Sequence, residues 1–115
     1  MKKRNDSVYL LDVLDAIHQI ETYLKDVIFD GFTKDRLIQD GVVHQLEIIG
    51  EASRNLSQSF RDQHPEIPWQ DIIGMRNRIA HVYFAVDLRT VWDTAKSDLP
   101  DLRQWLEGVL SRGVL

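Results

Sequence analysis

Cysteine is absent from this sequence of 115 residues. Without thiols the chain can form neither a disulfide framework nor a thiolate metal site, and this composition is typical of proteins in the reducing cytoplasm. Only three prolines occur, and no low-complexity stretch divides the chain. A chain of this size and balance predicts one compact domain over residues 1–115.

Long apolar runs are also missing. No stretch reaches the roughly 18 consecutive apolar residues that a membrane-spanning helix needs. The basic N-terminal residues "MKKR" are not followed by the continuous apolar segment of a secretory signal. We therefore expect a soluble cytoplasmic protein that has no membrane partner.

Positive charge is scarce as well. The chain has 14 Lys and Arg residues against 18 Asp and Glu residues, which gives a formal net charge of −4. This balance argues against a broad basic face for nucleic acid, because such binding relies on clustered cations that release counterions. A local basic site within an acidic molecule stays compatible with the composition.

Strand signals are absent too, because no segment alternates polar and apolar residues and no Asn-Gly hairpin occurs. Apolar residues instead recur every three or four positions, which indicates amphipathic helices. The spacing predicts helices over residues 7–28 and 34–64, from Pro68 through Ile79, and over 88–109. We expect an all-α fold, an antiparallel four-helix bundle with a long second helix and a kinked last helix. A bundle this small leaves apolar surface uncovered, so we also expect a homodimer.

Capping residues and proline indicate where the helices are expected to begin and end. Asp6 or Ser7 suits the N-cap of the first helix, and Gly31 suits a C-terminal cap after it. Asp87 is the expected N-cap of the last helix. Pro100 lies inside that helix, which predicts a kink or interruption near Asp98.

One polar stripe invites a metal interpretation. His44, Glu47 and Glu51 are spaced to share one face of the second helix, as ligands do in metal-binding bundles. Those sites need matching motifs on facing helices, and the usual order is Glu followed by His three residues later. Here no other helix supplies such a pair, so we favour a solvated polar stripe. The sequence also lacks a glycine-rich phosphate loop and a serine nucleophile motif, and we expect neither metal nor cofactor.

The stretch "MRNRIAHVYF" at 75–84 collects reactive side chains at the end of a predicted helix. Arg76 and His81 are five residues apart, which on a regular helix separates them by about 140° and roughly 7.5 Å. Three arrangements would still bring them together: a local helix distortion, a long reach by the arginine, or completion of the site by a second copy. Spacing alone leaves a helix-capping surface cluster and a functional site equally open.

The same stretch resembles the R-x4-H-x-Y signature of HEPN domains, with Arg76, His81 and Tyr83 in the three defined places and polar Asn77 after the arginine. The resemblance extends to "LEIIGEASRNLS" at 46–57, "PEIPWQDIIGMRNRIAHVYFAVDLRTVW" at 65–92 and the later "LPDLRQWL". These segments are similar to the HepT-like branch of that superfamily.

The resemblance implies a dimeric helical bundle and a metal-independent endoribonuclease whose motifs meet at a shared cleft. It further implies a toxin of a type VII-like toxin-antitoxin system. The implied partner is an MNT-type nucleotidyltransferase antitoxin, which neutralises the toxin by transferring AMP to Tyr83. The alternative is a catalytically inactive HEPN scaffold or a nucleotide-binding partner of a nucleotidyltransferase.

The implied residue roles agree with elementary chemistry. His81 can exchange a proton near neutral pH, and Arg76 can stabilise the charge that develops on a phosphate when a 2′-hydroxyl attacks it. Asn77 either orients that phosphate or completes a helix cap. Glu51 either braces Arg76 or is structural, and Arg78 is expected in a salt bridge or an RNA contact. The sequence does not specify the RNA target.

Overall fold

The structure is a computed structural model that describes residues 5–80 and 87–112, without the side chains of residues 76–80. All regular elements in these ranges are helices, which confirms the predicted all-α class. No helix in these ranges is both long enough and apolar enough to span a membrane. The elements are α1 (Asp6–Leu24), α2 (Phe29–Thr33), α3 (Arg36–Asn55), α4 (Gln58–Gln63), α5 (Trp69–Ala80), α6 (Leu88–Asp93), the π-helical turn η1 (Thr94–Asp98) and α7 (Leu99–Ser111).

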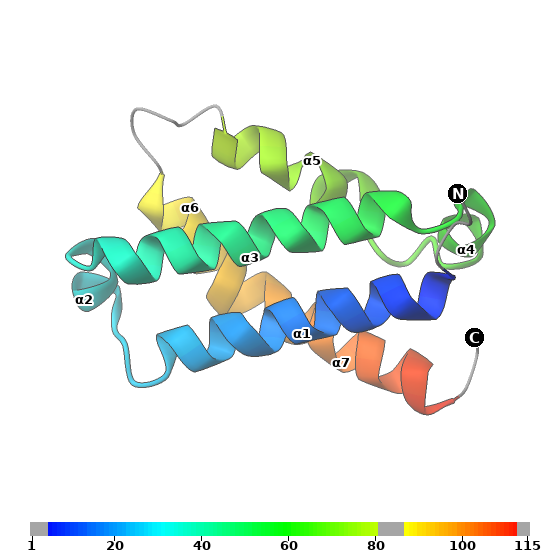
Figure 1. Cartoon of the computed structure of the whole chain (residues 1–115), viewed down its shortest axis with the longest axis horizontal. Helices are drawn as coiled ribbons and strands as arrows, with labels where there is room; N and C mark the ends of the chain where they lie inside the picture. Colours follow the sequence, from blue (N-terminus) through cyan, green and yellow to red (C-terminus); the bar gives the residue numbers. More distant parts are fainter. Residues whose placement is uncertain (1–4, 81–86, 113–115) are drawn as a thin grey trace.

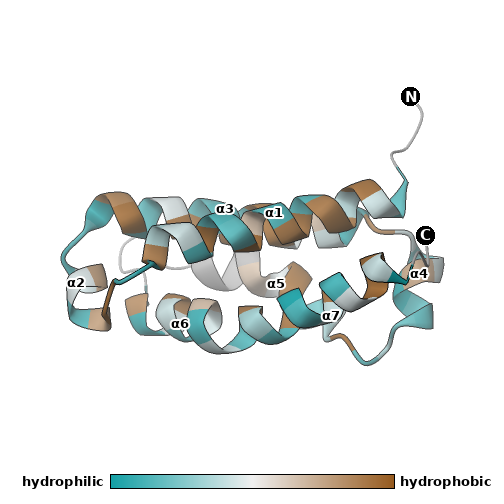
Figure 2. Cartoon of the chain, turned by 90° about the horizontal axis from the view of Figure 1, so that it is seen from below, coloured by the Kyte–Doolittle hydropathy of each residue, from teal (hydrophilic) through white to brown (hydrophobic). Residues whose placement is uncertain are grey.

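The longest helices lie side by side. α1 packs along α3 in the opposite direction, α5 covers another side of α3, and α7 packs against α1 (Figure 1). Hydrophobic residues recur along these helices (Figure 2), and a buried core forms from them. Burying each such large side chain contributes roughly 1.5–3 kcal/mol. The fully enclosed residues include Leu10, Ile17, Leu46, Ile49 and Leu106. The finer arrangement, a dimeric four-helix bundle, stays a prediction.

The first helix is shorter than predicted. Asn5, and neither Asp6 nor Ser7, is its N-cap, because the Asn5 side chain accepts a hydrogen bond from the Val8 N–H at 3.2 Å. The helix ends at Leu24 instead of residue 28. Asp26 then adopts a positive φ of 62°, a left-handed conformation that short polar residues tolerate and that stops helical propagation.

The expected break at Gly31 is also wrong. Gly31 lies inside the short helix α2, whose Phe32 is completely buried. Burial of this aromatic ring favours a helical turn where local glycine signals indicated a loop. The next helix, α3, begins at Arg36 instead of residue 34. Its N-cap is Asp35, whose side chain accepts a hydrogen bond from the Ile38 N–H at 3.1 Å.

The single long helix predicted over 34–64 is likewise wrong. α3 ends at Asn55, Leu56 is extended, and Ser57 begins α4 by accepting a hydrogen bond from the Phe60 N–H at 3.1 Å. The cause is a long-range contact. Ser57 donates through its N–H and its hydroxyl to the two carboxylate oxygens of Asp6, at 2.8 and 2.7 Å. These bonds to α1 hold Ser57 outside the helical conformation.

The last helical segment follows the prediction closely. Asp87 caps α6 by accepting from the Thr90 N–H at 3.1 Å and from the Thr90 hydroxyl at 2.7 Å. These bonds lower the pKa of the Asp87 carboxyl. The interruption expected near Asp98 is the π-helical turn η1, which precedes Pro100 at the start of α7. A wider turn fits here because proline donates no hydrogen bond and crowds the preceding turn.

Candidate functional site

The segment before α5 is fixed by aromatic side chains. As predicted, the helix starts after Pro68. The Trp69 indole N–H donates to the carbonyl oxygen of His64 at 2.9 Å, which closes the connection from α4. The Trp69 ring also lies 6.2 Å from the ring of Phe60 and 5.8 Å from that of Trp105, both edge-on. This packing sets the direction in which α5 leaves the loop.

Glu66 ties the same loop to α7. The Trp105 indole N–H donates to Glu66 Oε2 at 3.0 Å, and His64 Nδ1 lies 3.5 Å from the same oxygen. A hydrogen bond from its own backbone lowers the pKa of Glu66 most, and the bonds from Trp105 and His64 lower it further. The His64 ring packs between Phe60 and Trp105, at 4.5 and 5.3 Å. His64 is therefore part of the aromatic packing between α4 and α7.

α3 and α5 approach each other at Gly50. A Cβ at this position would lie 3.2 Å from the carbonyl oxygen of Ile72 and 3.7 Å from that of Ile73, so only glycine permits this approach without a shift. In a regular helix the Ile72 carbonyl accepts from the N–H of Arg76. Gly50 therefore sets the position of the backbone that carries the predicted catalytic arginine. Nothing in the hydrophobic periodicity indicates this contact.

The predicted site residues are placed in part. Arg76 and Asn77 lie on α5, where the backbone is described and their side chains are not. His81 and Tyr83 lie outside the described residues. Glu51 pairs with Arg54 of the next helical turn, with Arg54 Nη2 2.8 Å from Glu51 Oε1. The joint geometry of the predicted catalytic group, including the bracing of Arg76 by Glu51, stays a prediction.

The polar stripe on α3 does not form a metal-ligand cluster. Over 5–80 and 87–112, no group of three or more histidine or acidic residues is arranged to hold an ion. His44 is exposed to solvent and Glu47 is half-buried on the same helix. The exposure of His44 fits the solvated polar stripe favoured from the sequence.

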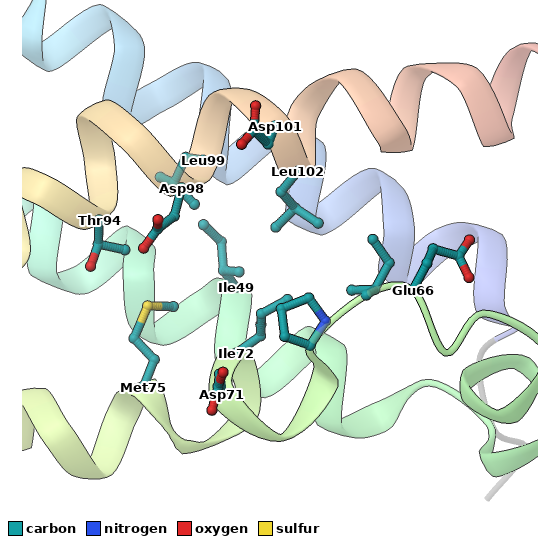
Figure 3. Close-up of a pocket in the computed structure, with 12 residues that line it drawn as sticks. Ile49, Glu66, Asp71, Ile72, Met75, Thr94, Asp98, Leu99, Asp101 and Leu102 are labelled. Carbon is teal, nitrogen blue, oxygen red and sulfur yellow. The ribbon is translucent and has the colours of Figure 1, made fainter.

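A cavity of about 390 Å³ lies between α5, η1 and α7 (Figure 3). Its apolar lining includes Met75, the residue directly before Arg76. Four acidic residues also line it, from the loop before α5 and from α5, η1 and α7. These carboxylates repel phosphate, so the cavity is unsuited to an RNA backbone. The acidic residues are Glu66, Asp71, Asp98 and Asp101.

Comparisons with known proteins agree on one family. The family described as "Ribonuclease HepT-like" matches residues 13–109, a range that includes α3, α5 and the signature segment. A protein named "Probable ribonuclease HepT" from Thermococcus cleftensis is 44% identical over 101 residues, which cover 88% of this chain and 92% of that relative.

Two further relatives carry the words "Putative RNase" in their names. One, from Methanocaldococcus jannaschii, is 35% identical over 107 residues, which cover 93% of this chain and 98% of that protein. The other, from Caldanaerobacter subterraneus, is 36% identical over 104 residues, with 90% and 93% covered. No solved structure matches the chain significantly. With a family match across most of its length and relatives aligned nearly end to end, the chain belongs to the HepT-like ribonuclease family.

Proposed function

We propose that the protein is a metal-independent endoribonuclease in which Arg76 and His81 act at a cleft shared by two protomers. The observation that carries this proposal is the intact R-x4-H-x-Y pattern within a chain of the HepT-like ribonuclease family. The close approach of α3 at Gly50 supports it, because it fixes the backbone of the helix that carries Arg76. A site near a rigid helix crossing is better preorganised than one held only by a loop.

The reaction needs no metal. One His81 removes the proton from a ribose 2′-hydroxyl, and the resulting oxygen attacks the adjacent phosphorus. The bond to the 5′-oxygen breaks, and the second protomer's histidine returns a proton to that leaving oxygen. The products are a 2′,3′-cyclic phosphate and a free 5′-hydroxyl. Arg76 stabilises the extra negative charge on the phosphate oxygens through its planar pair of donors.

Two residues support this pair. Asn77 directly follows Arg76 on α5 and orients the scissile phosphate through its amide. Glu51 neighbours Gly50 on α3, so it lies on the helix that crosses α5. It braces Arg76 by charge pairing, in addition to its contact with Arg54.

The proposed nuclease activity is regulated at the same site, through Tyr83. We assign the protein as the toxin of a type VII-like toxin-antitoxin system with an MNT-type nucleotidyltransferase as antitoxin. The Tyr83 phenol attacks the α-phosphate of ATP, AMP is attached and pyrophosphate leaves. The added group brings bulk and negative charge to the place where the RNA phosphate binds, so cleavage stops.

The test is cleavage of RNA in the presence of EDTA. We expect the wild type to cut and His81→Ala and Arg76→Ala to lose the activity, while Arg112→Gln, at the far end of α7, retains it. Equal cleavage by wild type and His81→Ala would overturn the proposal. Sedimentation of the wild type tests the dimer, and a monomer that still cleaves would exclude the shared cleft. A folded dimer that never cleaves any RNA would favour the scaffold alternative.

A further inference from the structure

An acidic protein that binds RNA needs a local group of exposed Lys and Arg side chains to contact the phosphates. Several basic side chains of the described ranges form exposed, weak pairs with carboxylates, as Lys34 does with Asp30 and Arg36 with Asp40. The four carboxylates at the otherwise largely apolar cavity between α5, η1 and α7 repel phosphate. Arg89 and Lys96 differ, because the cation of each also lies over an aromatic ring. The surface around Arg89 and Lys96 therefore offers both positive charge and aromatic rings to an RNA strand.

This face combines two aromatic rings and two cations. Phe29 of α2 and Trp92 of α6 meet edge-on, with ring centroids 5.7 Å apart. The Arg89 guanidinium carbon lies 4.8 Å from the centroid of Phe29, and Lys96 Nζ lies 5.0 Å from that of Trp92. We call these four residues the aromatic–cation face. α2 and α6 lie at the same end of the molecule in both views (Figures 1 and 2).

The protein core anchors the aromatic rings of this face, while the side chains of Arg89 and Lys96 stay exposed to solvent. The buried Phe32 packs against Trp92 with centroids 5.3 Å apart, which anchors the indole. Phe29 and Trp92 are half-buried, and Lys96 is exposed. The Arg89 side chain is 66% exposed and pairs with Asp93 at 3.3 Å. Such an exposed pair is weak, so a phosphate can replace the carboxylate.

The face also follows the signature segment closely in the chain. Arg89 comes eight residues after His81 and six after Tyr83. Asp87 fixes the start of α6 between them through its two bonds to Thr90. α6 and the face on it thus follow the signature segment directly along the chain.

We propose that the aromatic–cation face binds the single-stranded RNA that the protein cleaves, an inference that rests on the proposed function. When Lys96 leaves the Trp92 ring to contact a phosphate, a base takes its place on the indole. A second base stacks on the guanidinium that covers Phe29, and the edge of this guanidinium contacts a phosphate. Stacking requires unpaired bases, and aromatic rings interleaved with cations are how proteins hold single strands without reading their sequence. The substrate class is thus unpaired RNA.

The charge test uses the full chain with His81→Ala, so that binding is measured without cleavage. The probe is a fluorescein-labelled single-stranded RNA of about 12 nucleotides, read by anisotropy over a range of salt. Arg89→Gln and Lys96→Gln each weaken binding several-fold and reduce the slope of the salt dependence by about 0.7 for each phosphate that is no longer neutralised. Arg112→Gln, the matched removal of one charge on α7, changes neither. Asp93→Asn strengthens binding, because it removes the carboxylate that competes for Arg89.

The stacking test compares this RNA with one of equal length that lacks its bases. Trp92→Leu weakens binding of the normal RNA by about 5-fold to 100-fold and leaves binding of the abasic strand unchanged. Trp92→Phe keeps most of the affinity. Thermal unfolding checks each variant, and Phe29→Leu replaces Trp92→Leu if the latter does not fold. Double-stranded RNA binds more weakly than the single strand.

The outcomes separate this inference from the cleavage proposal. If the wild type cleaves RNA and all the face variants bind like the parent, the inference is wrong and the nuclease stands. Tighter binding of duplex than of single strand also overturns it. If the wild type does not cleave but Trp92→Leu and Lys96→Gln weaken binding as described, the face stands and the nuclease proposal falls.

Discussion

Gly50 of α3 lies so close to Ile72 of α5 that a Cβ at position 50 would stand 3.2 Å from the Ile72 carbonyl oxygen. The contacting atom belongs to the backbone and cannot rotate away, so any larger residue must push the two helices apart. Because α5 carries Arg76, the glycine links helix packing to the geometry of the proposed site.

The first prediction follows from this contact. Gly50→Ala destabilises the protein by about 1 kcal/mol, because overpacking outweighs the gain in helix propensity. It also lowers RNA cleavage about tenfold, since small displacements of a catalytic group are costly. Thermal unfolding and the cleavage assay measure the two effects.

Gly74→Ala on α5 is the matched control. A Cβ there meets nothing within 4 Å among the atoms described. The substitution should therefore stabilise the protein by about 0.5–1 kcal/mol through helix propensity alone. If Gly50→Ala stabilises the protein to the same extent, the close approach of α3 and α5 at Gly50 does not affect the free energy of unfolding.

A second prediction concerns the junction of α3 and α4. Ser57→Ala removes the N-cap of α4 and the hydroxyl bond to Asp6, and costs about 1–2 kcal/mol in the free energy of unfolding. Urea denaturation measures the change. Ser59→Ala, an exposed serine two residues later, should stay within about 0.5 kcal/mol of the wild type. Equal effects of the two substitutions would contradict the capping role.

A third prediction is a pH dependence from Glu66. Its pKa in the folded protein lies below the ordinary 4.5, so the stabilisation is present above that value and is lost as the pH falls through the folded pKa. Glu66→Gln keeps an acceptor for Trp105 but removes the titration. Its unfolding midpoint should therefore fall less than that of the wild type at pH values below 4.5. Superimposable pH profiles would show that the Glu66 contacts do not contribute.

A fourth prediction tests the switch. Co-expressed with the proposed MNT-type nucleotidyltransferase antitoxin, the wild type should gain the mass of AMP on the peptide that contains Tyr83 and lose RNA cleavage. Tyr83→Phe should gain no mass and should keep cleaving in the presence of the partner, whereas Tyr23→Phe should behave like the wild type. Intact-protein mass spectrometry and the cleavage assay are the measurements. Neutralisation of Tyr83→Phe without any mass gain would point to inhibition by binding alone.

Local signals predicted part of this fold well. The periodic apolar residues of α1 and α3 are buried as expected, Asp87 caps its helix, and the interruption near Asp98 is present. Each of these features depends on residues a few positions apart, which a sequence pattern reflects directly. The failures at Gly31 and Ser57 depend instead on burial of Phe32 and on a carboxylate from α1.

The functional residues likewise fall into those that a local motif reveals and those that only the fold brings together. The signature at 75–84 was visible in the sequence, and the family match is consistent with its interpretation. The aromatic–cation face was not visible, because Phe29 and Trp92 are far apart in the chain and meet only through the fold. Hydrophobic periodicity predicts that such aromatic residues lie in the core, and it does not indicate which of them stay partly exposed to solvent.

The bonds between Asp6 and Ser57 have a practical consequence for work with this protein. A shortened version that begins after Asp6 would lose the acceptor that holds Ser57, together with Asn5, which caps α1. Two helix starts would be weakened by one deletion at the chain's beginning. Fusion tags are therefore better joined ahead of an unchanged Asn5, with a spacer that leaves both caps free to form.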